Sequence, residues 1–179
     1  KRSLGLGQKL RLMKDCRKLS SGMKKTMKFK SKIVSYNKAA VIARKLHKTG
    51  KKIVFKTGCF DVFHVAHIYA LAHAKKQGDS LFVGVGSDAT LRALKGKGRP
   101  IFPERYRAEV LAALEPVDYV VILNEPLKGR IDHEKIISLI RPDYYMLPPD
   151  DKVLAEKQKM AQKYGVKIKF KPEMKSLYT

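Results

Sequence analysis

Apolar and polar positions along the chain follow two alternating periods. The β-branched run Ile53-Val-Phe55 breaks at Thr57-Gly58, which is typical of a buried strand. Apolar residues at helical spacing follow, from about His64 to Gly78. Strand and helix patterns then continue to alternate along the chain. Because a strand-helix-strand order brings strands together in parallel, the sequence predicts an α/β fold with a parallel sheet in a three-layer α/β/α sandwich.

The pattern also predicts where each element lies. Ser35 caps a first helix that Gly50 closes, and Asp132 caps a helix at 133–140. The carboxyl ends of the parallel strands should form the ligand crevice. The predicted strands are 52–56, 80–85, 118–122, 143–147 and 167–170, and the other predicted helices are 65–77, a short one after Ser87, 103–114 and 151–164.

Two histidines stand at the start of the helix predicted after the first strand. His64 and His67 are three residues apart, so both lie on the first turn. Unpaired backbone N–H groups and the positive end of the helix dipole favour an anion there. Two imidazoles can add hydrogen bonds to a phosphate and share its negative charge. The other histidines (His47, His73 and His133) are expected on the surface or on helix faces.

The residues around this pair resemble a known family. Strand, G-x-F-D-x-x-H-x-G-H and helix is the pattern of the HxGH nucleotidyltransferases, the cytidylyltransferase-like superfamily. The closest resemblance is to heptose-phosphate adenylyltransferases and glycerol-phosphate cytidylyltransferases, and it implies a Rossmann-like fold. The matching residues are Gly58, Phe60, Asp61, His64 and His67, with Ala66 at the glycine position, so that the motif reads His-Val-Ala-His.

Further segments follow in the family's order over about 32–179. Segments 84–88, 94–100 and 104–107 match a second strand and turn, a mobile lysine loop and a helix start, and 175–179 resembles the Ser-Thr-Thr signature. The resemblance implies direct nucleotidyl transfer from ATP or CTP, with Mg²⁺ arriving on the nucleotide and no other cofactor required. The implied catalytic residues are His64, His67 and Lys95, and the implied nucleotide-binding residues are Gly58, Phe60, Asp61, Asp88, Arg107, Ser176 and Thr179.

Some of these residues have a structural alternative. Asp61 and Asp88 could hold turns, and Arg107 could pair with an acid such as Glu104, its i, i+3 neighbour. No metal-ligand spacing of cysteine and histidine is found, and no disulfide framework, because Cys16 and Cys59 are the two cysteines. Both are expected to be reduced thiols in an intracellular compartment. No apolar run is long enough to span a membrane.

Two departures from the family pattern predict a weakened donor site. Ala66 adds a methyl group where glycine lets a phosphate approach the helix backbone. Pro148-Pro149 follows the fourth predicted strand where relatives carry Lys-Gly-Gly-Asp near the base, and two prolines remove two backbone donors. Whether the site still turns over is therefore left open.

Charge is the second strong signal, since the formal net charge is +23. Residues 1–31 hold eleven Lys/Arg and one acid, a net of +10, and 32–179 hold 28 Lys/Arg and 15 acids, a net of +13. We therefore divide the chain into a basic extended arm, 1–31, and a nucleotidyltransferase-like domain, 32–179. The expected RNA-binding residues of the arm are Lys1, Arg2, Lys9, Arg11, Lys14, Arg17, Lys18, Lys24, Lys25, Lys28 and Lys30.

Two functions follow. The favoured interpretation is a repurposed fold that contacts RNA within a large ribonucleoprotein, most plausibly a mitochondrial ribosome or its assembly particle. Its partners would be ribosomal RNA and neighbouring subunits, with a nucleotide or phosphate as a further ligand and no membrane. The location would be the mitochondrial matrix, with the cytoplasm as the alternative. The alternative function is an active nucleotidyltransferase that transfers AMP or CMP to a phosphosugar or phosphopolyol and releases pyrophosphate.

Overall fold

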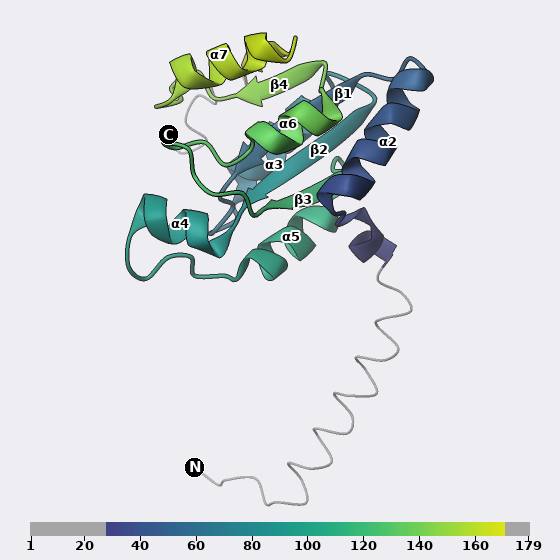
Figure 1. Ribbon diagram of the computed structural model, residues 1–179. Coiled ribbons are helices and arrows are strands. Elements are labelled where there is room, and N and C mark those ends of the chain that lie inside the picture. The colour runs from purple at the N-terminus through teal and green to yellow at the C-terminus, as the bar shows by residue number, and fades with distance from the viewer. Residues whose placement is uncertain (1–27, 171–179) are drawn as a thin grey trace, which may run out of the picture.

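The computed structural model describes residues 28–170, which alternate between helices and strands after a short 3-10 helix, as Figure 1 shows. The predicted order of helices and strands is confirmed from residue 36 onward. The elements are η1 (Lys28–Lys32), α2 (Tyr36–Lys48), β1 (Ile53–Gly58), α3 (Val65–Lys75), β2 (Ser80–Gly86), α4 (Asp88–Lys95), α5 (Glu104–Ala112), β3 (Tyr119–Leu123), α6 (Glu134–Ile140), β4 (Tyr144–Leu147), α7 (Leu154–Lys163) and β5 (Lys167–Phe170).

The five strands form one parallel sheet in the order β3-β2-β1-β4-β5. The chain starts in the middle at β1, proceeds outward through β2 and β3, and then returns to the other side of β1 for β4 and β5. This reversal puts β1 at the point where strand order changes, and in such sheets ligands bind outside the carboxyl ends of the strands. The predicted three-layer α/β/α sandwich with a parallel sheet is confirmed.

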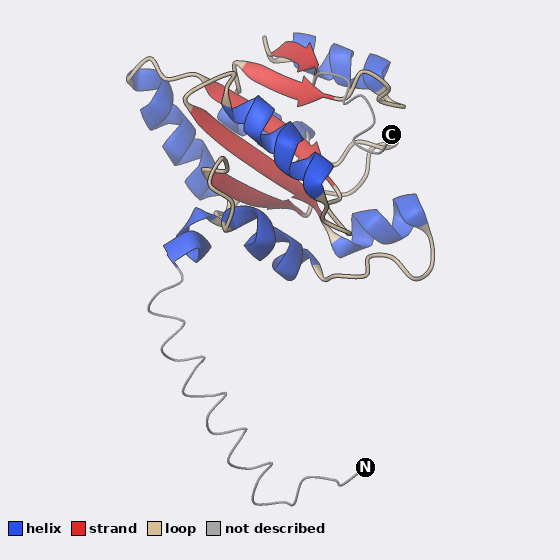
Figure 2. Ribbon diagram, turned by 180° about the vertical axis from the view of Figure 1, so that it is seen from behind, coloured by secondary structure: helices blue, strands red, loops and turns tan. Residues whose placement is uncertain are grey.

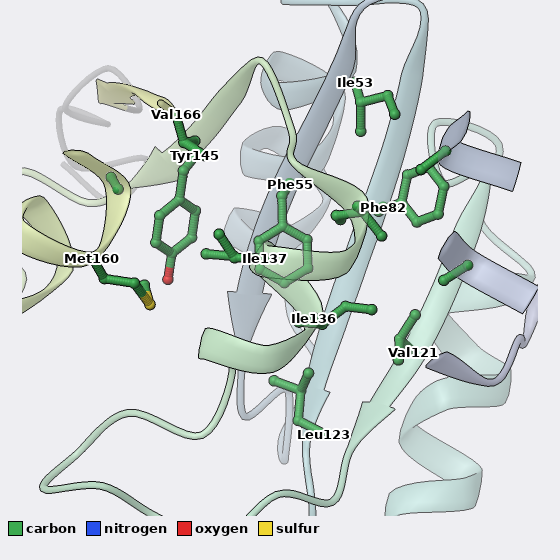
Figure 3. Close-up of a cluster of buried hydrophobic side chains, with 14 of the residues drawn as sticks. Ile53, Phe55, Phe82, Val121, Leu123, Ile136, Ile137, Tyr145, Met160 and Val166 are labelled. Carbon is green, nitrogen blue, oxygen red and sulfur yellow. The ribbon is translucent and has the colours of Figure 1, made fainter. Parts of the chain in front are cut away.

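Two apolar layers hold the helices on the sheet. On one face, α2, α6 and α7 cover a cluster that includes Phe55, Phe82 and Tyr145, shown in Figure 3. On the other face, α3 and α5 cover a cluster that includes Leu71, Val83 and Leu111. Figure 2 shows the molecule from behind, with helices on both sides of the strands. Both faces of the inner strands are therefore buried, which explains why their sequences are continuously apolar rather than alternating.

Most predicted element ends agree with the structure within a few residues. Ser35 caps α2, since its side chain accepts a hydrogen bond from the Lys38 N–H at 3.3 Å. The prediction for α6 is wrong: the N-cap is His133, and Asp132 makes its hydrogen bond to the His133 ring instead. The helix therefore begins one residue later than predicted.

The start of the chain's described part also differs from the sequence prediction. Lys28 and Lys30, assigned to an extended arm, lie in η1. Lys30 pairs with Glu109 of α5 at 3.3 Å, and Ile33 forms a parallel bridge with Val120. The remaining arm residues, 1–27, lie outside the described residues.

The turn between α3 and β2 depends on a glycine for space. A Cβ at Gly78 would lie 2.9 Å from the Lys52 carbonyl oxygen, whereas a Cβ at Gly84 would meet side chains at 3.0 Å and beyond. We expect Gly78→Ala to lower the free energy of unfolding by about 1–3 kcal/mol, and by more than Gly84→Ala, because backbone yields less than side chains. Urea unfolding of both variants measures this. A larger loss for Gly84→Ala would contradict the steric reason.

Candidate functional site

A pocket of about 490 Å³ opens at the carboxyl ends of β1, β2 and β4. Its lining joins the His-Val-Ala-His segment to the end of α4, the segment before α6 and the loop after β4. The lining includes Thr57, Gly58, Cys59, Phe60, His64, Ala66, His67, Gly86, Lys95, Arg130, Asp132, His133, Pro148, Asp151 and Lys157. The predicted convergence of distant segments at the strand ends is thus observed.

The two motif histidines stand together at the start of α3. His64 is the N-cap residue in extended conformation (φ −144°), and His67 is the third helical residue. Their ring centroids are 4.0 Å apart. The backbone N–H of His64 donates to Nδ1 of His67 at 3.4 Å. In the neutral ring, Nδ1 as acceptor places the proton on Nε2, which makes that atom a hydrogen-bond donor.

An unusual backbone conformation precedes the histidines. Phe60 has φ +48°, a left-handed conformation that costs a bulky residue energy and is concentrated at functional sites. Its ring packs edge-on against the His67 ring, with centroids 5.2 Å apart. Gly58 makes the turn possible, because a Cβ there would lie 2.8 Å from the Phe60 ring. Gly58 and Phe60 therefore shape the wall against which His67 is held.

Arg107, which does not line this pocket, secures the turn. Its side chain is only 1% exposed. Nη1 donates to the carbonyl oxygens of Cys59 (2.6 Å) and Gly86 (2.8 Å), and Nε donates to that of Phe102 (2.8 Å). Nη2 donates to the carboxylate of Asp88 at 2.7 Å. All three guanidinium nitrogens thus have protein acceptors, and the ion-pair partner is Asp88 rather than Glu104.

Asp61 and Asp88 both hold turns in the structure. Asp88 and Glu104 exchange hydrogen bonds between side chain and backbone in both directions, at 2.7 and 2.8 Å. Asp61 accepts from Arg99 at 2.7 Å and from the N–H groups of Ile101 and Phe102. Burial raises the pKa of the Asp61 carboxyl, but Arg99 and the two N–H groups outweigh it and hold the pKa below its ordinary value.

Some of the predicted site residues line the pocket, others brace the turns around it, and the rest lie outside the described residues. Gly58, Phe60, His64, His67 and Lys95 line the pocket. Asp61, Asp88 and Arg107 do not line it and instead brace the surrounding turns. Ser176 and Thr179 lie outside the described residues, as do the arm cations from Lys1 to Lys25.

The sequence did not predict a series of hydrogen-bonded polar side chains along the pocket. His133, expected on the surface or on a helix face, is buried between Asp132 and Tyr145. Burial lowers the pKa of its imidazole, although Asp132 opposes the shift, so the ring is neutral at physiological pH. Asp151 and Lys157 form a largely buried ion pair at 2.8 Å in the same pocket. Position gave only part of the signal, because Asp132 and Asp151 lie at the starts of the helices predicted after the third and fourth strands.

Comparisons with known proteins now fix the family. A model of the family described as "Cytidylyltransferase-like" matches residues 55–173. The chain belongs to this family. The Bifunctional protein HldE of a Nitratiruptor species is 46% identical over 111 residues, which cover 62% of this chain and 23% of that protein. That of Geobacter metallireducens is 52% identical over 82 residues, or 46% of this chain and 17% of that protein. The chain thus spans about a fifth of these relatives' length.

Solved structures agree with the family assignment. The lipopolysaccharide core biosynthesis protein from Thermoplasma volcanium is 34% identical with a TM-score of 0.55, over 68% of this chain and 94% of that one. Pantoate-beta-alanine ligase from Francisella tularensis has a TM-score of 0.60 over 81% of this chain and 68% of that one. At 18% identity, the second likeness concerns the fold alone.

The favoured sequence interpretation, an RNA-contacting ribosomal component, is wrong. The cytidylyltransferase-like match and the HldE relatives point to the enzymatic alternative. RNA and ribonucleoprotein subunits as partners, and the mitochondrial location inferred with them, are withdrawn for the same reason. Net charge misled because an excess of cations does not by itself identify a partner.

Two further observations concern the described range. Within residues 28–170, no helix is both long and apolar enough to cross a membrane. The same range contains no group of three or more histidine, cysteine or acidic side chains placed to hold a metal ion.

The Asp61 contacts predict a pH-dependent contribution to stability. At pH 7, Asp61→Asn should lower the free energy of unfolding by about 1–2 kcal/mol, because charge-assisted bonds to Arg99 and two N–H groups are weakened. The folded-state pKa is lowered, so the contribution is complete above the ordinary value of 3.8 and disappears as pH falls through the folded pKa. Unfolding curves at pH 7 and pH 3 measure the difference. Exposed Asp150→Asn is the control, and an unchanged gap at pH 3 would contradict the assignment.

Proposed function

We propose that this domain is a nucleotidyltransferase that transfers AMP or CMP from a nucleoside triphosphate to a phosphosugar or phosphopolyol and releases pyrophosphate. The observation that carries the proposal is the pocket in which His64, His67 and Lys95 meet at the strand ends of a cytidylyltransferase-like fold. The same residues and spacing support the resemblance to enzymes of this reaction type. The HldE relatives support it at the level of sequence.

The histidine pair would act on the transferred phosphoryl group. An oxygen of the acceptor phosphate attacks the α-phosphorus, a new P–O bond forms, and the bond to the β-phosphate oxygen breaks to release pyrophosphate. Nε2 of His67, protonated because Nδ1 accepts from His64 N–H, would donate to an α-phosphate oxygen. The start of α3 adds backbone N–H groups and the positive dipole end. Catalysis would then rest on positioning and electrostatics.

Cations around the pocket would neutralise the leaving phosphates. Lys95 ends α4, and Arg130 enters from the segment before α6. Arg107 would contribute as a positioning residue, because its guanidinium nitrogens already bond to protein acceptors. Mg²⁺ would arrive bound to the triphosphate and supply additional positive charge. The acids lining the pocket fit a metal that keeps mainly phosphate and water ligands, since Asp151 is held by Lys157 and Asp132 by His133.

The first test is turnover. Pyrophosphate release should be measured for ATP and CTP, each with a panel of sugar and polyol phosphates. For the productive pair, His67→Ala should reduce kcat by about 100- to 1,000-fold, the usual loss when a donor to the transition state is removed. His73→Ala, on the same helix and outside the pocket, is the matched control and should retain activity. Background release with every pair, or equal loss in both variants, would overturn the proposal.

The second test concerns the methyl group of Ala66. If it keeps the triphosphate from the helix backbone, Ala66→Gly should tighten ATP or CTP binding several-fold, about the effect of one added hydrogen bond. Glycine inside a helix costs about 1 kcal/mol of stability, so Ala72→Gly on the same helix serves as the control. Calorimetric titration of the three proteins measures the affinities. Weaker or unchanged binding by Ala66→Gly would show that the methyl group is not the obstruction.

A further inference from the structure

A continuous chain of hydrogen bonds runs from a buried carboxylate to the end of β1. Oδ1 of Asp132 lies 3.1 Å from Nδ1 of His133, and Nε2 of His133 lies 2.7 Å from the Tyr145 hydroxyl. The Tyr145 hydroxyl lies 3.1 Å from Oγ1 of Thr57. The side chains of His133 and Asp132 are only 3% and 9% exposed, and Tyr145 is fully buried. The reaction proposed above uses none of these four residues.

Chemistry fixes the direction of every bond in this chain. A carboxylate only accepts, so Nδ1 of His133 must donate to Asp132 and Nε2 must then accept. Burial lowers the pKa of His133 and raises that of Tyr145, so the imidazole is neutral and the phenol keeps its proton. The Tyr145 hydroxyl therefore donates to His133 and accepts from Thr57. The hydroxyl hydrogen of Thr57 is used in the bond to Tyr145, so toward a ligand in the pocket Oγ1 of Thr57 can act only as an acceptor.

Three of the four residues in this hydrogen-bond chain reach the pocket surface. Thr57, Asp132 and His133 all line it, whereas Tyr145 lies behind. Among the described residues, Asp132 bonds to His133 through Oδ1. Its other oxygen, Oδ2, lies near the end of β2, 3.7 Å from the position that a Cβ on Gly86 would take. This wall thus presents a carboxylate oxygen and a hydroxyl oxygen, both acceptors. Such a wall repels phosphate and favours a neutral group that donates hydrogen bonds.

We propose that Asp132 and Thr57 form a subsite for sugar hydroxyl groups, with His133 and Tyr145 as the positioning residues that orient them. Sugar hydroxyls are neutral, donate hydrogen bonds and are carried by the phosphate-bearing substrates that the cationic part of the pocket would hold. They have two sources, the ribose of the nucleotide and the sugar or polyol of the acceptor. The inference rests on the proposed function for the presence of such substrates, and on the hydrogen-bond chain for the contact itself.

The experiment compares ligand pairs that differ in hydroxyl groups. Calorimetry gives the affinity ratio of ATP to 2′,3′-dideoxy-ATP, and that of glucose 1-phosphate to inorganic phosphate. Asp132→Asn is nearly isosteric: its amide oxygen can still accept from His133, which turns a donating NH₂ toward the pocket in place of an acceptor. Asp118→Asn removes the same charge from a carboxylate that binds the Leu81 N–H at the start of β2, away from the pocket, and is the matched control.

One of the two ratios should be about tenfold or more in the natural protein and should fall toward one in Asp132→Asn, as expected for the loss of a hydrogen bond to a charged group. The ratio that falls identifies the source, ribose or acceptor. Thr57→Val should lower the same ratio, and Thr57→Ser, which keeps the hydroxyl, should restore it. Tyr145→Phe should lower the same affinity ratio, because Thr57 and His133 lose the hydroxyl that orients them. In the natural protein, the imidazole ¹⁵N shifts of His133 should show that Nδ1 carries the proton.

Two other results would overturn the inference. Ratios near one in the natural protein, or ratios that Asp132→Asn and Thr57→Val leave unchanged while ATP still binds, would mean that no hydroxyl is held here. The proposed function would survive that result if pyrophosphate release persisted. Failure of ATP and glucose 1-phosphate to bind at all, together with background turnover, would overturn both.

Discussion

One buried guanidinium holds the parts of the site together. Arg107 bonds to the carbonyl oxygens that follow β1 and end β2, to the loop before α5 and to the carboxylate at the start of α4. A buried charge without partners is costly, so these segments are constrained to supply acceptors in one geometry. The left-handed conformation of Phe60, one residue after the Cys59 carbonyl, is tolerated because this geometry over-determines it. The histidine pair begins four residues after Phe60, so the conformation of that turn sets where the two rings lie.

The pocket combines two kinds of wall that suit two parts of one substrate. The start of α3, with His64 and His67, and the lysine at the end of α4 offer donors and positive charge. The wall made by Thr57 and Asp132 offers acceptors whose direction is set by His133 and Tyr145. β1 connects them, because Thr57 belongs to the second wall and Gly58 to the turn that leads to the first. A phosphorylated, hydroxyl-rich molecule matches this division.

The large positive charge had pointed to a polyanion, and the family relationship corrected this. Formal charge counts side chains, whereas binding depends on which charges remain available on a surface. In the described domain, some lysines form ion pairs with carboxylates that also accept hydrogen bonds from the backbone N–H groups of strands. Asp118 binds Lys75 and the N–H of Leu81. Asp143 binds Lys52 and the N–H of Ile53. Some lysines thus join elements, but 28 Lys/Arg against 15 acids in 32–179 leaves an excess of 13 cations even if every acid is paired, and this excess does not by itself identify a ligand.

The sequence by itself determined the parallel α/β sandwich, because alternating periods leave few ways to bury both faces of apolar strands. The resemblance of its motifs to the cytidylyltransferase-like family implied that His64, His67 and Lys95 belong to one site, and all three line the pocket. Only the tertiary structure decided that Arg107 braces turns rather than facing the pocket, and that His133 is buried. The physical reason is distance along the chain: Arg107 finds its acceptor at Cys59 across 48 residues, and burial of His133 depends on Tyr145 of a neighbouring strand. Local pattern specifies elements, but the partners of a buried polar group are specified by packing.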